Sequence, residues 1–318
     1  VTCFDPISEK RTAFSKRFGC DHEKSYKDVL KRDDIDGLHL ATPNHLHAEQ
    51  TLLAAEHAKH VFVEKPIANT LSDGRKMIDA CQKAGVILMV GQHLRRLTGI
   101  RKLKEMIEAG AIGNPIQIEG NYSQNLGFAL TPESFRWRGD DSGCPAGSLM
   151  TMGIHHADVF NYLFGPIKTV FSYFNKLYIP APVDDVTTTV FQYKTGVLGY
   201  LGSNYASPKA VWFYVYGTEA NLLCTITPPE LPFEEYLLWW QQVDQDTDVQ
   251  IFEKGKTGST TVPLALGNPI VEEIDEFADC ILTGARPETD GKGALSALAF
   301  IRAAIESSRS GKQARLEA

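Results

Sequence analysis

One short segment of this sequence has residue types and spacing suited to proton transfer. His155 and Asp158 lie three residues apart and Tyr162 follows four residues later, so a helix would present all three side chains on one face. An imidazole titrates near neutral pH, which suits it to remove a proton from a hydroxyl group. The segment therefore predicts His155 as a general base, oriented by the carboxylate of Asp158. A half-exposed helix with an ordinary, hydrogen-bonded histidine is the alternative.

A second candidate group is the lysine in Glu64-Lys65-Pro66, which follows the β-prone run 60–63. A lysine at the carboxyl end of a strand, held beside an acid, can polarise a substrate oxygen as negative charge develops on it. The same tripeptide is common in solvated turns, but its place directly after a strand favours a functional role for Lys65.

The segment from Ala41 to His47 also lies between a strand and a helix. It places small and polar groups at the carboxyl edge of a sheet, where open α/β sheets bind their ligands. An ordinary turn that starts a helix is the alternative. His45 and His47 point in different directions near a helix start, and no carboxylate or thiol cluster accompanies them, so we expect no metal site.

The elements that must position these groups alternate in type along the first part of the chain. Strands are expected at 1–5, 37–41, 60–63 and 85–91, and helices at 6–18, 48–57 and 72–84. Strands that are apolar on both faces and alternate with helices indicate a parallel sheet covered on both sides. The first 95 residues therefore predict most of a doubly wound, Rossmann-like domain.

Longer β-prone runs follow after a helix at 99–109. They lie at 116–122, 169–174, 186–193, 197–203 and 211–216, with hairpin turns at 194–196 and 217–219. Helices are expected at 268–284 and 294–307. The remainder of the chain, 96–318, therefore predicts an α/β domain with a large, mostly antiparallel sheet.

Asp5 stands at the end of the first expected strand. In a dinucleotide-binding unit, the acid that binds the adenosine ribose also stands at the end of a strand. In that unit a glycine-rich turn lies about 20 residues before the acid, and a strand precedes the turn. If Asp5 is that acid, the glycines fall before residue 1. We therefore expect the first strand and the glycine-rich loop to be missing from this sequence. An Asp5 that only caps the following helix is the alternative.

Six motifs occur together in this order. They are Asp5, A-T-P-N-x-x-H at 41–47, E-K-P at 64–66, G-Q-H-L-R at 91–95, W-R at 137–138, and L-x-x-x-G-x-H-x-x-D at 149–158. With this order and spacing, the sequence resembles the Gfo/Idh/MocA family of nicotinamide-dependent oxidoreductases along essentially its whole length. Two residues depart from the family pattern: Thr151 stands where many relatives have an aspartate, and Tyr162 where inositol dehydrogenase-like members have a histidine. The second departure argues against an inositol dehydrogenase.

The resemblance implies a dinucleotide-binding domain, 1–95, and a domain for substrate binding and oligomerisation, 96–318. It implies NAD as the cofactor, with NADP as the alternative, because an acid at position 5 repels a 2'-phosphate. Carried over residue by residue, it places Asp5 at the ribose, Thr42, Pro43, Asn44, His47 and Gln92 along the cofactor cleft, Glu64 and Lys65 near the nicotinamide, and Trp137 and Arg138 against the cofactor from the second domain. Arg95, Tyr122 and Tyr162 are candidate substrate contacts.

The implied reaction is reversible oxidation of a secondary hydroxyl on a sugar, polyol or sugar derivative, with Lys65, His155 and Asp158 as the catalytic residues. Two rivals remain open: a glycosidase or lyase that retains NAD, and a dinucleotide-sensing regulator without turnover. The formal net charge is only -7 and the charged residues are spread along the chain, so the sequence has no basic patch suited to nucleic acid or an anionic membrane. We expect neither as a partner. We expect a cytoplasmic protein that forms homo-oligomers through the C-terminal sheet.

Overall fold

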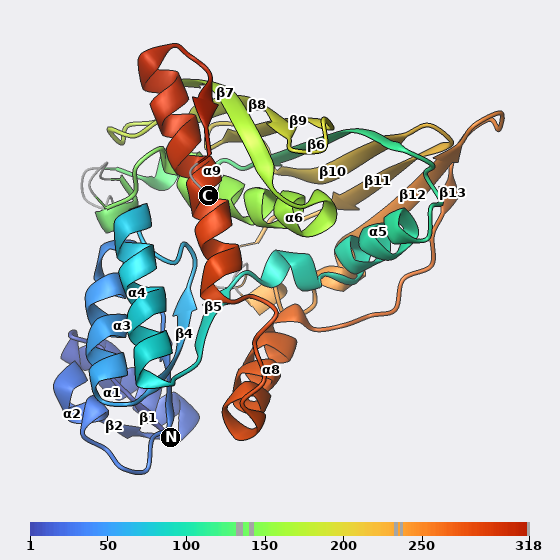
Figure 1. Ribbon diagram of the computed structural model, residues 1–318. Helices are drawn as coiled ribbons and strands as arrows, with labels where there is room; N and C mark the ends of the chain where they lie inside the picture. The colour runs from blue at the N-terminus through green and yellow to red at the C-terminus, as the bar shows by residue number, and fades with distance from the viewer. Residues whose placement is uncertain (132–135, 140–142, 232–234, 236–237, 317–318) are drawn as a thin grey trace.

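A small parallel sheet forms the centre of the N-terminal half in the computed structural model, which describes residues 1–131, 136–139, 143–231, 235 and 238–316 (Figure 1). Its order is β3 (Gly37–Leu40), β4 (His60–Glu64) and β5 (Leu88–Gly91). The helices α3 (His47–Glu56) and α4 (Leu71–Ala84) lie against the face that bears Val61 and Val63. The opposite face bears Phe62, which packs on Phe277 of the distant helix α8 (Pro269–Thr283). The middle residues of β4 and all of β5 are apolar and buried, as the sequence predicts for covered strands, whereas His39 on β3 is exposed.

A second, two-stranded parallel sheet pairs β1 (Thr2–Cys3) with β2 (Asp21–His22). The helix α1 (Ser8–Phe18) connects the two strands, and the short helix α2 (Tyr26–Leu30) follows. This sheet and the β3-β4-β5 sheet do not pair with each other within the described residues. The upstream strand and glycine-rich loop stay a prediction.

The second half of the chain is built on a nine-stranded sheet in the order β13-β12-β11-β10-β6-β9-β8-β7-β14. The bounds of its strands are β6 (Pro115–Ser123), β7 (Ile167–Asn175), β8 (Val186–Tyr193), β9 (Leu198–Asn204), β10 (Ala210–Gly217), β11 (Ala220–Ile226), β12 (Thr247–Glu253), β13 (Thr260–Thr261) and β14 (Ala314–Arg315). Among the described strands of this sheet, only the pair β6 and β9 is parallel. The predicted large, mostly antiparallel sheet is confirmed, with β11 and β12 in addition to the strands read from the sequence.

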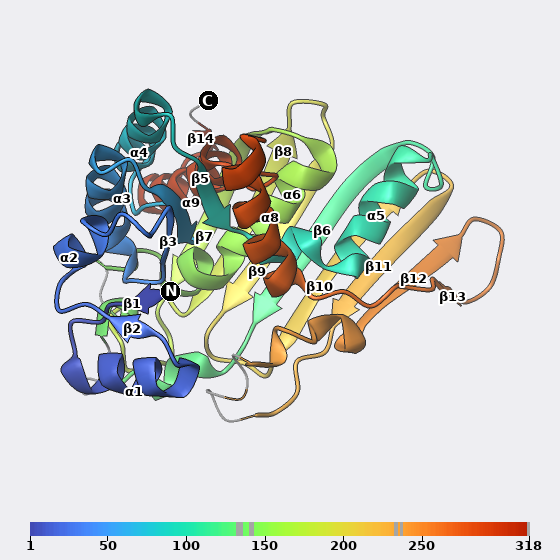
Figure 2. The same ribbon diagram turned by 90° about the horizontal axis from the view of Figure 1, so that it is seen from below.

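Helices cover one face of this sheet, as Figure 2 shows for α5 (Thr98–Glu108), α6 (Ile154–Phe164) and α9 (Gly291–Ser310). Gly120 on β6 permits the close approach of α6, because a Cβ there would lie 2.9 Å from the Phe160 ring. Phe213 of β10 is buried on the same side, whereas its neighbours Trp212 and Tyr214 face the other way and are half-buried. The fold therefore presents α6 to one side of the sheet and leaves an aromatic surface on the other.

The last two long helices begin and end at residues with clear local signals. Asn268 accepts a hydrogen bond from the Val271 N–H at 3.1 Å, and Gly284 ends α8 in the left-handed conformation, as the sequence predicts. Helix α9 begins three residues earlier than expected, at Gly291, because Asp290 accepts from the Gly293 N–H at 2.9 Å. In the part of the chain that the structure describes, no helix has the length and apolar character to cross a bilayer.

Candidate active site

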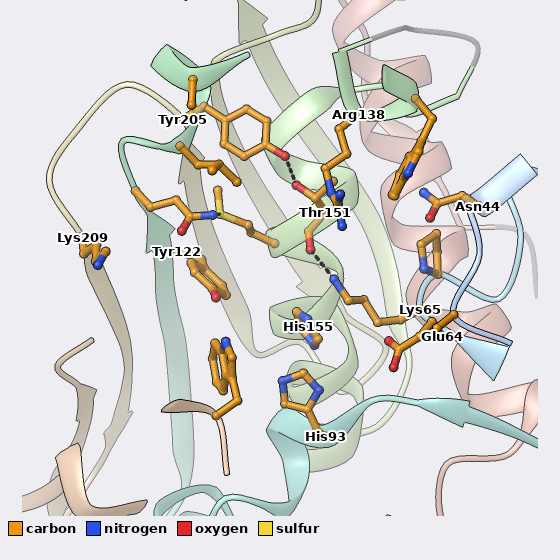
Figure 3. Close-up of a pocket in the computed structure, with 18 of the residues that line it drawn as sticks. Asn44, Glu64, Lys65, His93, Tyr122, Arg138, Thr151, His155, Tyr205 and Lys209 are labelled. Atoms are coloured by element: carbon orange, nitrogen blue, oxygen red, sulfur yellow. Dashed lines mark hydrogen bonds between the residues drawn. The ribbon is translucent and has the colours of Figure 1, made fainter. Parts of the chain in front are cut away.

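A cleft of about 1000 Å³ opens where β3 and β4 end, and the start of α6 and the end of β6 form its opposite wall (Figure 3). Nine of the residues singled out in the sequence line it: Thr42, Pro43, Asn44, Glu64, Lys65, Tyr122, Trp137, Arg138 and His155. The ends of parallel strands share one edge of a sheet, so segments far apart in sequence meet there. The cleft brings Lys65 and His155 to one common space.

The side chain of Lys65 lies deep in this cleft. Its Nζ donates a hydrogen bond to the carbonyl oxygen of Thr151 at 2.8 Å. Burial lowers the pKa of the Lys65 amine to about 8, Glu64 opposes this shift, and the positive charge of Arg138 adds to it. A substantial fraction of Lys65 is therefore neutral at mildly alkaline pH, and a neutral amine can accept a proton.

His155 stands at the start of α6, directly after a π-helical turn, Leu149–Gly153. It is only 4% exposed, and its Nδ1 is buried without a hydrogen-bond partner among the described residues. Burial lowers its pKa well below the ordinary imidazole value, and the charge of Lys65 lowers it further. Both effects favour the neutral imidazole near pH 7, and the role of His155 as general base stays a prediction.

Asp158 has a different partner from the one expected. Its two carboxylate oxygens accept hydrogen bonds from Arg95, from Nε at 2.7 Å and from Nη2 at 2.5 Å. Both side chains are nearly inaccessible, at 1% for Asp158 and 9% for Arg95. A buried guanidinium needs a paired carboxylate, so Asp158 holds Arg95 and does not orient His155.

Arg95 and Tyr162 do not line the cleft, which corrects their assignment as substrate contacts. The Arg95 guanidinium lies 5.3 Å from the centre of the Tyr162 ring and also donates to the carbonyl oxygen of Glu288. Lys104 lies 5.5 Å from the same ring. These side chains form a contact between α6 and the segment that follows β5, behind the cleft.

His47 is buried and also lies outside the cleft. Its Nδ1 lies 2.8 Å from the carbonyl oxygen of Pro66, and its Nε2 lies 2.9 Å from that of Thr42. The ring thus bridges the segment after β3 and the segment after β4. Its expected cofactor contact is corrected to a structural contact between two segments that do line the cleft.

Polar atoms without protein partners occur at the edge of the small sheet. The side-chain nitrogen of Asn44 and both amide atoms of Gln92 are buried and make no hydrogen bond to any described residue. Such orphaned amides need a partner, and the carboxamide, ribose and phosphate groups of a dinucleotide would supply it. Arg138 stacks on Trp137 at the cleft, with its guanidinium carbon 4.5 Å from the ring centre.

Asp5 lies outside this cleft, and one of its carboxylate oxygens accepts a hydrogen bond from the Ile7 N–H at 2.7 Å. This is close to the helix-start role that the sequence left open. A ribose contact by Asp5 stays a prediction.

His93 and Trp240 are among the cleft residues that sequence reasoning missed. His93 lies inside the recognised segment 91–95, at the first position of the 3-10 helix η2 (His93–Arg96). Its place directly after β5 was a usable signal. Trp240 lies between β11 and β12, and nothing in the sequence around it pointed to the cleft.

Two family models match the chain in succession. Residues 1–92 match the oxidoreductase family with an NAD-binding Rossmann fold, and residues 100–223 match the GFO/IDH/MocA C-terminal domain. Both models describe one family and together cover most of the chain. The chain belongs to the Gfo/Idh/MocA family. Its N-terminal half is accordingly an NAD-binding Rossmann fold, as the resemblance implied.

Similar proteins cover nearly the whole chain. A 1,5-anhydro-D-fructose reductase of Ensifer adhaerens is 25% identical over 100% of this chain and 91% of its own. A 2,7-anhydro-N-acetylneuraminate hydratase of Escherichia coli is 27% identical over 96% of this chain and 87% of its own. A crystal structure from Desulfitobacterium hafniense, assigned as an NADPH-dependent oxidoreductase, is 29% identical and has a TM-score of 0.92, covering 99% of this chain and 90% of its own.

Proposed function

We propose that this Gfo/Idh/MocA protein is an NAD(P)-dependent oxidoreductase that interconverts a secondary hydroxyl and a carbonyl on a sugar, polyol or sugar derivative. The observation that carries the proposal is the convergence of Lys65 and His155 on one cleft at the carboxyl edge of the Rossmann sheet. The family and the named reductase relative support the same chemistry.

The residues around the cleft suit a dinucleotide. Asn44 offers a buried amide nitrogen at the cleft, and Trp137 with Arg138 offers an aromatic and a cationic surface. Gln92 does not line the cleft, and its unpaired amide lies just after β5. A bound nicotinamide would supply the hydride acceptor or donor for the reaction. The acid at position 5 favours NAD, whereas the Desulfitobacterium relative is assigned to NADPH, so both cofactors belong in the test.

Lys65 is the group best suited to move the proton. In the oxidation direction, the neutral amine accepts the proton of the substrate hydroxyl, and the resulting ammonium stabilises negative charge on that oxygen. In the reduction direction, the ammonium donates its proton to the carbonyl oxygen, which thereby becomes the new hydroxyl. His155 stays neutral and orients the hydroxyl by a hydrogen bond. This division of roles replaces His155 with Lys65 as the proton acceptor.

The test uses the full-length protein and a panel of sugars and polyols with NAD and NADP, with the absorbance of reduced nicotinamide as the readout. In Lys65→Ala we expect turnover to fall about 100-fold or more, the usual contribution of a proton-transfer group. The dissociation constant for the cofactor should change little. Unchanged turnover in this variant would reject the role of Lys65.

The hydratase relative favours one alternative, an enzyme that retains NAD and oxidises its substrate only transiently. The same residues would serve, because the proton and hydride return within one cycle. Such an enzyme forms product with no net build-up of reduced nicotinamide and needs no added cofactor. A pure dinucleotide sensor has no use for a lysine and a histidine that converge on the cleft, which argues against that alternative.

We also propose that the chain divides near residue 95 and assembles through the open face of the nine-stranded sheet. Trp212, Tyr214 and Tyr216 alternate along β10 on that face and are half-buried, and Tyr173 on β7 is 69% exposed. Contiguous apolar surface of this kind marks protein contacts. Tyr214→Glu should lower the oligomer mass measured by light scattering, whereas an unchanged mass would argue against this interface. A cytoplasmic location stays a prediction.

A further inference from the structure

The imidazole of His93 borders the cleft and has no role in the proposed proton transfer. The residue stands directly after β5, at the start of η2, and lines the same space as Lys65. Its Nε2 is buried and has no hydrogen-bond partner among the residues that the structure describes. Buried polar atoms in folded proteins nearly always have a partner, so this nitrogen points to a missing one.

Two neighbouring rings define where that partner lies. The His93 ring centre is 4.7 Å from that of His155 and 5.0 Å from that of Trp240. Figure 3 shows the two imidazoles close together, with Lys65 approaching from the side opposite Tyr122. His93, His155 and Trp240 therefore form one continuous part of the cleft wall, beside the proton-transfer group.

Both imidazoles are neutral under ordinary conditions. Burial lowers the pKa of His93 to about 4, and it lowers that of His155 well below its ordinary value. A neutral imidazole has one N–H donor and one acceptor nitrogen. A hydroxyl group both donates and accepts, so two adjacent neutral imidazoles suit two adjacent hydroxyls.

We propose that His93 binds the hydroxyl on the carbon next to the reacting one, so that the substrate is a ring with two adjacent hydroxyl groups. This inference rests on the proposed function, because Lys65 and His155 define the reacting carbon. Trp240 lies edge-on to His93 and supplies an apolar surface for the C–H groups of such a ring. His93 is then a substrate-binding residue that sets specificity.

The test asks whether removing the His93 side chain and removing one substrate hydroxyl affect kcat/KM independently of each other. The probes are levoglucosan and myo-inositol, because their rings do not open, together with the analogues of each that lack one hydroxyl. The readout is kcat/KM, measured for wild type and for His93→Ala. We expect His93→Ala to lower kcat/KM about tenfold for the parent ring, the usual effect of one lost neutral hydrogen bond. For the analogue that lacks the adjacent hydroxyl, wild type and variant should be equal.

A purely structural role for His93 would lower kcat/KM by the same factor for every analogue, and that result would overturn the inference. His93→Gln keeps an amide donor and acceptor and should recover part of the discrimination, which covers the case in which His93→Ala folds poorly. Binding of NADH, measured by its fluorescence, should be equal in all three proteins. A wild type that binds NADH but acts on no ring of the sugar and polyol panel would overturn both this inference and the sugar reaction. An active wild type in which His93→Ala lowers kcat/KM by the same factor for every analogue overturns this inference alone.

Discussion

Replacing Asp158 by asparagine separates the two roles that this carboxylate could have. If Asp158 oriented His155, Asp158→Asn would lower turnover and leave stability nearly unchanged. In the structure its two oxygens pair with Arg95, and no hydrogen bond joins it to His155 within the described ranges. We therefore expect the main effect to be on stability.

The size of this effect follows from the burial of the pair. The side chains of Asp158 and Arg95 are 1% and 9% exposed, so the variant leaves a guanidinium buried without its counter-charge. Breaking such a pair costs about 3–5 kcal/mol. For a chain of this size each kcal/mol lowers Tm by roughly 2 °C, so the expected fall in Tm is roughly 6–10 °C.

The assay is thermal unfolding followed by circular dichroism, together with kcat measured well below the transition. Asp79→Asn on the exposed surface of α4 is the matched control and should change stability by less than about 0.5 kcal/mol. The double variant Arg95→Met/Asp158→Leu removes both charges and should recover most of the lost stability.

The reasoning is refuted if Asp158→Asn keeps the wild-type Tm while kcat falls about 100-fold or more, the scale of a lost proton-transfer contribution. That pattern would return Asp158 to the role of orienting His155. A double variant that is less stable than the single one would also contradict the description of the pair as two mutually dependent charges.

Two further predictions concern the cleft itself. The value of kcat/KM for oxidation should rise with pH through an apparent pKa of about 8, because Lys65 must lose its proton before it can accept one from the substrate. Glu64→Gln removes the negative charge that raises the pKa of Lys65, so the midpoint of this pH profile should move to lower pH. An unmoved midpoint would contradict the assignment of Lys65 as the proton acceptor. Asn44→Ala should weaken NADH binding about tenfold in a fluorescence titration. We expect little loss of stability, because the side-chain nitrogen of Asn44 has no partner in the described part of the protein. An unchanged dissociation constant for NADH would remove Asn44 from the cofactor site.

Much of the fold could be predicted because local pattern and tertiary environment agree. The middle residues of β4 and all of β5 are apolar and buried, as continuous apolar runs predict. The caps at Asn268 and Gly284 define the ends of α8 as the sequence indicates. The strand β11 pairs with β10 across the turn predicted at 217–219, whereas β12 pairs with β11 only after a longer connection, which a local pattern does not reveal.

The sequence by itself determined that Thr42 and Lys65 come to one edge of a sheet, because the carboxyl ends of neighbouring parallel strands share that edge. Spacing along α6 also placed His155 and Asp158 three residues apart, but it could not decide what each side chain meets. Only the tertiary structure assigned Arg95 to Asp158 and brought His93 beside both His155 and Trp240. The physical reason is that helical periodicity defines which side chains share a face, whereas the partner of each buried charge or ring depends on segments that may lie far away in the chain.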